Sequence, residues 1–167
     1  RVLKVKVPYH SIHMNPLKDE LLEKLAPLSP KPATIPVVST VTGQLVEGAA
    51  AFDANYWWTN VRESVRFGKA MGELIRHDCN LFVEVGPHPV LASSIQECLD
   101  QHKHEAAIFY SLRRKDPEQE TVLGTLGALY TQGYPVDWSK QHPDGQREIR
   151  LPVYTWQRER YWNESEE

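Results

Sequence analysis

The sequence has few of the features that mark specialised protein classes. Only two of its 167 residues are cysteine, Cys79 and Cys98, and both have apolar, helical or strand-like surroundings. A disulfide-rich mini-domain is therefore excluded, and we predict two buried free thiols in a reducing compartment. No apolar run approaches the roughly 20 residues of a membrane span, and no charged-then-apolar leader opens the chain. We expect a cytoplasmic protein with no membrane partner.

Positive charge is not in surplus either. The chain has 19 Lys and Arg residues against 22 Asp and Glu residues, which gives a net charge of −3. Its densest basic cluster, residues 113–115, is followed at once by Asp116 and Glu118, which cancel its local field. We therefore expect no nucleic-acid partner. The 41% hydrophobic and 25% charged residues are typical of a soluble globular domain, with or without an appendage.

Several motifs of complete catalytic sites are also missing. The sequence has no G-x-S-x-G nucleophile turn, no glycine-rich phosphate loop and no dinucleotide fingerprint. Ser93 and Ser94 lie inside a helical pattern and have no glycine on either side. The chain alone therefore does not supply a recognisable nucleophile.

The hydrophobic pattern predicts strands that alternate with helices, which is typical of an α/β layer architecture. We expect strands at residues 2–7, 35–41, 81–85 and 107–112. We expect helices at residues 16–26, 65–75, 89–99 and 117–132, and a short helical turn at 53–58. The apolar run at 81–85 favours a parallel strand covered on both faces. In the last helix we expect burial of Val122, Leu126, Leu129 and Tyr130. The remaining residues, rich in Pro, Trp, Tyr and Arg, predict an extended tail that lies across a surface.

The first candidate site follows the opening strand, in the run Tyr9-His10-Ser11-Ile12-His13. A histidine at a strand end is well placed for acid–base catalysis, because imidazole titrates near working pH. The alternative is a surface or structurally bonded imidazole. His10 and His13 also resemble half of a metal site, but no third ligand has a suitable spacing, so we predict no metal.

Two further motifs have both a functional and a structural interpretation. Residues 84–89, Glu-Val-Gly-Pro-His-Pro, follow a strand at the sheet edge where α/β proteins bind ligands. The alternative is a rigid strand-to-helix turn without chemistry. Residues 60–67 combine arginine and glutamate in a pattern typical of ion pairs at a helix end. If a backbone carbonyl of this segment has a functional role, the identities of the side chains do not reveal it.

Taken together, these segments resemble the acyltransferase domain of type I polyketide synthases, modular or iterative. The resemblance is to the C-terminal half of that domain and to the linker that follows it. Five segments carry it, in the family's order: residues 7–14, 35–43, 56–67, 84–91 and 151–162. Ser64 departs from the pattern, because the family usually has proline there.

The resemblance implies a reaction and a set of site residues. The family transfers a malonyl-type extender unit from coenzyme A to the phosphopantetheine thiol of an acyl carrier protein, through an acyl-serine intermediate. His10 matches the active-site histidine, and Asn60 matches the position whose main-chain carbonyl accepts the other imidazole N–H. Tyr9, just before the histidine, matches a substrate-binding position where a bulky residue favours malonyl. No bound cofactor is implied, because the coenzyme A thioester is the substrate.

The resemblance also implies that part of the active site is elsewhere. The family's nucleophilic serine and its carboxylate-binding arginine lie upstream of the histidine, and neither can be placed on this chain. We expect residues 1–7 to be the last strand of a ferredoxin-like subdomain. Residues 8–112 would then form the C-terminal part of the hydrolase-like α/β subdomain, and 113–167 the post-acyltransferase linker.

The expected partners follow from this division. They are the missing N-terminal half of the acyltransferase, the ketosynthase domain and the acyl carrier protein, and we expect the chain to be inactive alone. The alternative function is a non-catalytic linker module that docks the acyltransferase to the ketosynthase, with Trp156, Tyr161 and Trp162 as anchors.

Overall fold

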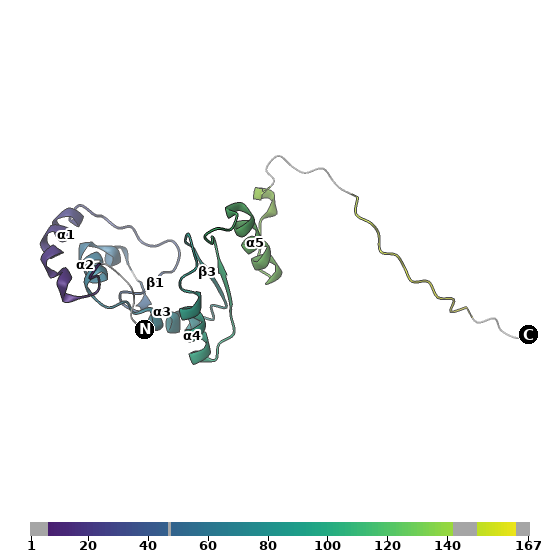
Figure 1. The fold of residues 1–167 in the computed structure, drawn as a ribbon, viewed down its shortest axis with the longest axis horizontal. Helices are drawn as coiled ribbons and strands as arrows, with labels where there is room; N and C mark the ends of the chain where they lie inside the picture. Colours follow the sequence, from purple (N-terminus) through teal and green to yellow (C-terminus); the bar gives the residue numbers. More distant parts are fainter. Residues whose placement is uncertain (1–6, 47, 142–149, 163–167) are drawn as a thin grey trace, which may run out of the picture.

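The structure is a computed structural model that describes residues 7–46, 48–141 and 150–162. It consists of a helical N-terminal part, a small α/β part and an extended C-terminal segment (Figure 1). Apart from Val7, the strand predicted at residues 2–7 lies outside the described residues. None of the helices in the described ranges has the length and apolar character that a membrane span requires.

The N-terminal part is built from short helices. A 3₁₀ helix, η1 (Ile12–Leu17), leads directly into α1 (Lys18–Leu25), and η2 (Ala49–Phe52) precedes α2 (Ala54–Arg62). The first helical segment thus begins earlier than the predicted residue 16, because the extended Ser11 caps η1 through its hydroxyl, which accepts from the His13 N–H at 3.3 Å. Helix α2 continues beyond the predicted turn at 53–58.

A tight hairpin, which lies between α1 and η2 in the chain, contacts both the helical part and the α/β part. Strand β1 (Val38–Ser39) pairs antiparallel with β2 (Gln44–Leu45), so the run predicted at 35–41 forms only a two-residue strand. Ser39 is buried, and its hydroxyl lies 2.9 Å from the Tyr56 hydroxyl of α2. This bond and the 3.0 Å bond from the Val41 N–H satisfy a polar group that would otherwise be costly to bury.

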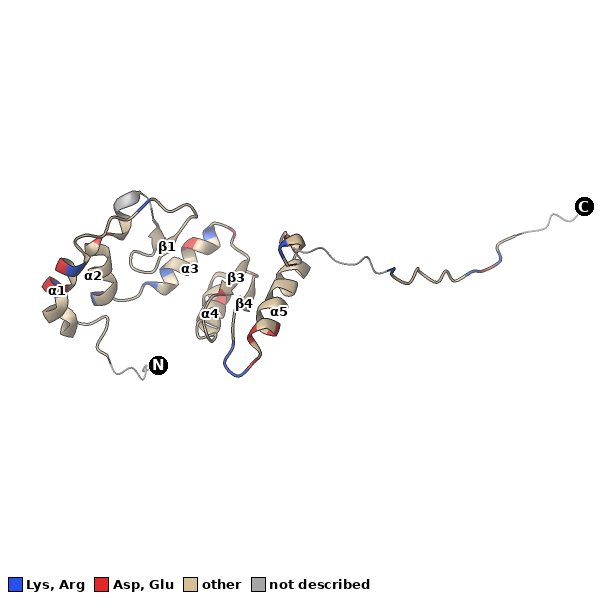
Figure 2. Cartoon of the chain, turned by 90° about the horizontal axis from the view of Figure 1, so that it is seen from above, with Lys and Arg blue, Asp and Glu red and all other residues tan. Residues whose placement is uncertain are grey.

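The α/β part follows the predicted order of helices and strands. It contains α3 (Phe67–Arg76), β3 (Leu81–Glu84), α4 (Ala92–His102), β4 (Ala107–Tyr110), α5 (Glu118–Thr131) and η3 (Trp138–Gln141). Strands β3 and β4 are parallel, in a register that pairs Leu81 with Ala107, and α4 is their crossover helix. Both strands lie between α4 and α5 (Figures 1 and 2).

The core lies where α3 and α4 meet the sheet. Its buried side chains are those of Met71, Phe82, Ile95 and Leu99. Cys79 and Cys98 pack against this cluster as free thiols, half-buried rather than buried as predicted. Partial burial, with a smaller contribution from Glu97, raises the pKa of the Cys98 thiol.

The sheet is covered less completely than the sequence predicts. Strand β3 buries Phe82 but leaves Val83 exposed, and Val85, directly after the strand, is 85% exposed. The prediction of coverage on both faces is therefore wrong for the described residues. Helix α5 contacts β4, where the Thr125 hydroxyl donates to the Tyr110 carbonyl at 2.7 Å, but Val83 of β3 stays 40% exposed. Helix α5 buries none of its residues: of the four expected to be buried, Val122 and Tyr130 are exposed, and Leu126 and Leu129 are half-buried.

The C-terminal segment extends away from the rest of the chain (Figure 1). Residues 150–162 form neither helix nor strand and are exposed throughout. Trp156, for example, is 73% exposed. Among the described residues, no surface packs against this segment, contrary to the prediction, and its interpretation as a linker tail stays a prediction.

Candidate active site

His10 is held by the C-terminal end of α2. Its backbone N–H donates to the Val61 carbonyl at 2.9 Å. The backbone of His10 has a φ of 62°, in the left-handed region that non-glycine residues seldom adopt. Such a conformation costs on the order of 1–3 kcal/mol and persists where the surroundings determine it. The hydrogen bond to Val61 is one contact that holds it here.

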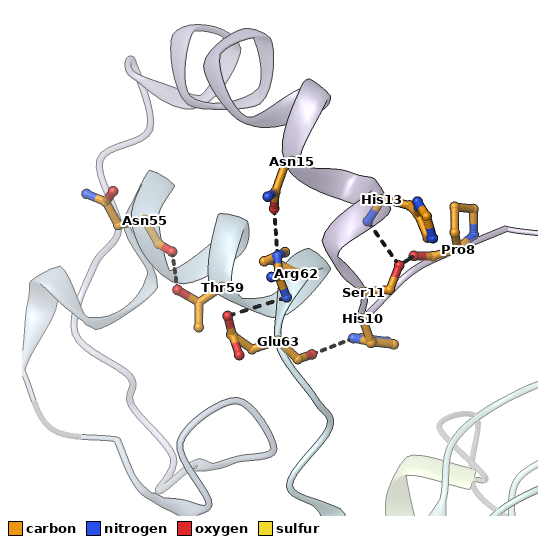
Figure 3. A network of polar contacts seen from close by, with 9 residues as sticks. All are labelled: Pro8, His10, Ser11, His13, Asn15, Asn55, Thr59, Arg62 and Glu63. Atoms are coloured by element: carbon orange, nitrogen blue, oxygen red, sulfur yellow. Dashed lines mark hydrogen bonds and ion pairs between the residues drawn. The ribbon is translucent and has the colours of Figure 1, made fainter.

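The imidazole ring is fixed by a second carbonyl of the same helix end. Its Nδ1 lies 2.8 Å from the Glu63 carbonyl oxygen (Figure 3). Because a carbonyl can only accept, Nδ1 carries the hydrogen, and Nε2 of the neutral ring keeps its lone pair. His10 is exposed, and no described residue hydrogen-bonds to Nε2. The ring is therefore oriented as a base whose reactive nitrogen faces open space.

The carbonyl that orients the ring belongs to Glu63, and the prediction that it belongs to Asn60 is wrong. Helix α2 ends at Arg62, and Glu63 follows it in an extended conformation. Carbonyls at a helix end have no partner within the helix, so they are available to other donors. Asn60 lies within the last turn of α2, half-buried beside a small cavity shared with Thr40 and Val41.

Arg62 connects the helix end to the segment that carries the histidine. Its Nε donates to Asn15 Oδ1 of η1 at 2.7 Å, and its guanidinium also lies 3.7 Å from the Glu63 carboxylate (Figure 3). This ion pair joins adjacent residues, whereas the pattern predicts partners three or four residues apart, and among the described residues Arg66 forms no ion pair with Glu63. The contact with Asn15, which sequence reasoning missed, links η1 to the end of α2, where two main-chain carbonyls bond to His10.

The neighbours of His10 provide no nucleophile among the described residues. Tyr9 is exposed, with its ring centroid 6.3 Å from that of His10. The Ser11 hydroxyl donates to the Pro8 carbonyl at 2.7 Å and caps η1, so it is engaged away from the imidazole. Within the described ranges, no group of three or more His, Cys, Asp or Glu residues could hold a metal ion. His10 therefore needs a reacting group from outside these contacts.

The second candidate motif, at residues 84–89, is a structural turn. The Glu84 carboxylate accepts from the Val90 N–H at 2.8 Å and from the Leu91 N–H at 3.0 Å. The Ser111 hydroxyl accepts from the Gly86 N–H at 3.0 Å, which fixes the turn to the end of β4. His88 Nδ1 accepts from the Arg114 N–H at 3.3 Å. The polar groups of this turn thus bond to the chain itself.

Replacing Glu84 with alanine is expected to destabilise the fold by about 2 kcal/mol, because it removes two charge-assisted hydrogen bonds at the start of α4. Urea unfolding measures the change, and Glu118→Ala at the exposed start of α5 is the matched control. If the two variants unfold at the same urea concentration, the carboxylate does not stabilise the turn.

Comparisons with known proteins identify the family of the chain. Residues 1–136 match the family described as "Acyl transferase domain". The chain is 44% identical over 164 residues to polyketide synthase GfsB of Streptomyces halstedii, covering 97% of this chain and 3% of that protein. It is 39% identical over 165 residues to erythronolide synthase EryA3 of Saccharopolyspora erythraea, covering 97% of this chain and 5% of that protein.

A solved structure shares the fold. The acyltransferase domain from the second module of the salinomycin polyketide synthase superposes with a TM-score of 0.79 at 35% identity. The match covers 90% of this chain but only 35% of that domain's chain. The chain thus spans a small fraction of the relatives and about a third of the solved domain. It belongs to the acyl transferase domain family, in the form found in type I polyketide synthases.

Proposed function

We propose that this chain is part of an acyltransferase that transfers a malonyl-type extender unit from coenzyme A to the phosphopantetheine thiol of an acyl carrier protein. The observation that carries the proposal is the geometry of His10, whose Nδ1 donates to the Glu63 carbonyl and whose Nε2 is left to accept a proton. Membership of the acyl transferase family supports it.

In the proposed reaction, His10 acts on a serine hydroxyl that another stretch of polypeptide contributes. Nε2 takes the hydroxyl proton while the serine oxygen attacks the thioester carbonyl of the coenzyme A substrate. The thiolate of coenzyme A leaves and takes the proton from the imidazolium. In the second half, Nε2 takes the proton of the carrier thiol while its sulfur attacks the ester carbonyl of the acyl-serine. The ester C–O bond breaks, and the leaving serine oxygen takes the proton back from the imidazolium. The Glu63 carbonyl holds the neutral ring in the required tautomer. In Ser–His–Asp triads a carboxylate has this role.

Tyr9 is the proposed selector of the extender unit. Its ring stands beside the imidazole, and a bulky side chain there leaves little room for an α-methyl group on the substrate. Discrimination of one methyl group amounts to about 1–3 kcal/mol. We therefore propose malonyl as the preferred unit, with no resident cofactor in the site.

The domain division belongs to the same proposal. Residues 1–7 complete a ferredoxin-like subdomain, 8–112 form part of the hydrolase-like subdomain, and 113–167 are the linker. The N-terminal half of the acyltransferase would supply the serine and would cover apolar residues that this chain leaves exposed, such as Val85. The carrier protein and the ketosynthase are the other proposed partners.

The isolated chain is expected to form no stable acyl ester with malonyl-coenzyme A, because the serine that His10 would activate lies outside this chain. Intact-mass spectrometry after incubation measures this directly. The matched sample contains the intact acyltransferase, in which a malonyl adduct should form on a serine outside this chain. A stable malonyl ester on any residue of this chain alone would contradict the proposal.

The C-terminal segment favours a second function, that of a docking element. Residues 151–162 expose large side chains, among them Trp156, Tyr161 and Trp162, and no surface formed by the described residues covers them. Aromatic residues of this kind dominate buried interfaces, so we propose that they dock the acyltransferase to the ketosynthase domain. Deleting residues 151–167 should weaken that association while leaving the unfolding of the remaining chain unchanged. Unchanged association would reduce the segment to a spacer.

A further inference from the structure

A cavity of about 750 Å³ lies between the β1–β2 turn, helix α3 and the end of α4. Its lining has no Asp or Glu but includes four basic residues: Arg66, Lys69, Arg76 and His102. We call this cavity the basic groove. Lys and Arg residues mark both ends of α3 (Figure 2), although the chain as a whole has a net charge of −3. The positive charge is therefore a local feature of this surface.

Two close backbone contacts build the basic groove. At Gly43, which has a φ of 74°, an added Cβ would lie 2.6 Å from the Lys69 Cβ, so the hairpin turn sits directly against the stem of the lysine. At Gly72, an added Cβ would lie 3.1 Å from His102 Nε2, so the His102 side chain reaches from the end of α4 to α3. Glycine at both positions allows these approaches. The hairpin turn and the His102 side chain thus border the basic groove along α3.

The charges at the N-terminal end of the groove are available to a partner. Among the described residues, Arg66 and Lys69 have no ion pair with an acidic side chain. Arg76, at the other end, pairs with Glu73, whose largely buried carboxylate also lies 3.2 Å from His77 Nε2. The net positive charge is therefore greatest around Arg66 and Lys69, whereas the charge of Arg76 is partly offset by Glu73.

We propose that the basic groove docks an acidic helix of a partner protein. Ten residues separate Arg66 from Arg76, which corresponds to about 15 Å along α3. A single phosphate reaches only one end of such a row, whereas a helix presents carboxylates at successive turns of one face. The length of the groove and the absence of acidic lining residues make it complementary to that surface. Charges of this kind mainly raise the association rate and select the partner.

The test uses a fluorescent alanine-based helical peptide with glutamates spaced to match Arg66, Lys69 and Arg76. Fluorescence anisotropy measures its binding to the full chain, and amide NMR shifts locate it. The matched peptide has glutamine in place of glutamate, and inorganic pyrophosphate is the small-anion probe. The groove variant is Arg66→Gln/Lys69→Gln, and the control is Arg113→Gln/Lys115→Gln, which removes the same charge from the exposed β4–α5 loop.

The glutamate peptide should shift the amides of residues 42–44 and 66–76, and the groove variant should weaken its binding by about tenfold. The loop variant should leave binding unchanged, the glutamine peptide should not bind, and added salt should weaken the complex several-fold. The proposal is overturned if the peptide does not bind, if the two variants weaken it equally, or if only pyrophosphate shifts these amides. None of these results bears on His10, so the proposed transfer reaction is tested separately.

Discussion

Replacing His10 with alanine in the intact synthase is expected to lower the rate of acyl transfer by about 10³-fold, because the variant loses the general base for both half-reactions. A single-turnover measurement of malonyl transfer to the carrier thiol gives this rate without interference from product release. The fold should persist, since the His10 side chain is exposed and the hydrogen bond from its backbone N–H to Val61 remains.

Two further variants separate loss of the base from loss of structure. His13→Ala removes an exposed imidazole three residues away, and transfer should stay within about twofold of the unaltered rate because such surface substitutions are nearly neutral. His10→Asn tolerates the left-handed backbone at this position and can still donate to Glu63, but it cannot accept a proton. It should be as slow as the alanine variant. Normal transfer by either His10 variant would remove His10 from the mechanism.

Replacing Leu99 with alanine is expected to reduce the free energy of unfolding by about 3 kcal/mol, because the change leaves a cavity in the most tightly packed part of the chain. Leu99 is 1% exposed and packs in the core with Met71, Phe82 and Ile95. Leucine and alanine both favour helix, so the loss of unfolding free energy reports packing rather than helix propensity. Urea unfolding of the chain gives the free energy of each protein from the midpoint and the slope of its unfolding transition.

The control for Leu99 is the same substitution on a helix with little burial. Leu123 of α5 is 43% exposed, so Leu123→Ala should cost less than about 1 kcal/mol. Equal destabilisation by the two substitutions would mean that α4 is not the centre of the core.

The α/β part could be predicted from the sequence because each element buries a local apolar face. Helix α3, strand β3, helix α4 and strand β4 all occur in the predicted order, with boundaries shifted by a few residues. The exposure of Val83 and Val85 could not be predicted in the same way. An apolar pattern indicates that a face favours burial, but it does not tell which segment covers that face.

The candidate site was predictable only as far as its side chains. His10 follows from its motif, whereas the Glu63 carbonyl is a main-chain group and leaves no signal in residue type. The available signal was the end of α2: extending the predicted turn at 53–58 to Arg62 would have made the next carbonyl a natural acceptor. The bond from Arg62 to Asn15 joins residues 47 positions apart, so it depends on tertiary packing that no local pattern contains.

The protonation state of the His10 ring is the most direct test of the account. ¹⁵N chemical shifts of the labelled imidazole, recorded at alkaline pH where the ring is neutral, distinguish the protonated nitrogen from the bare one. We expect the hydrogen on Nδ1, bonded to the Glu63 carbonyl, and a bare Nε2. The opposite tautomer, or the rapid averaging of a free imidazole, would contradict the claim that the end of α2 prepares this histidine as a base.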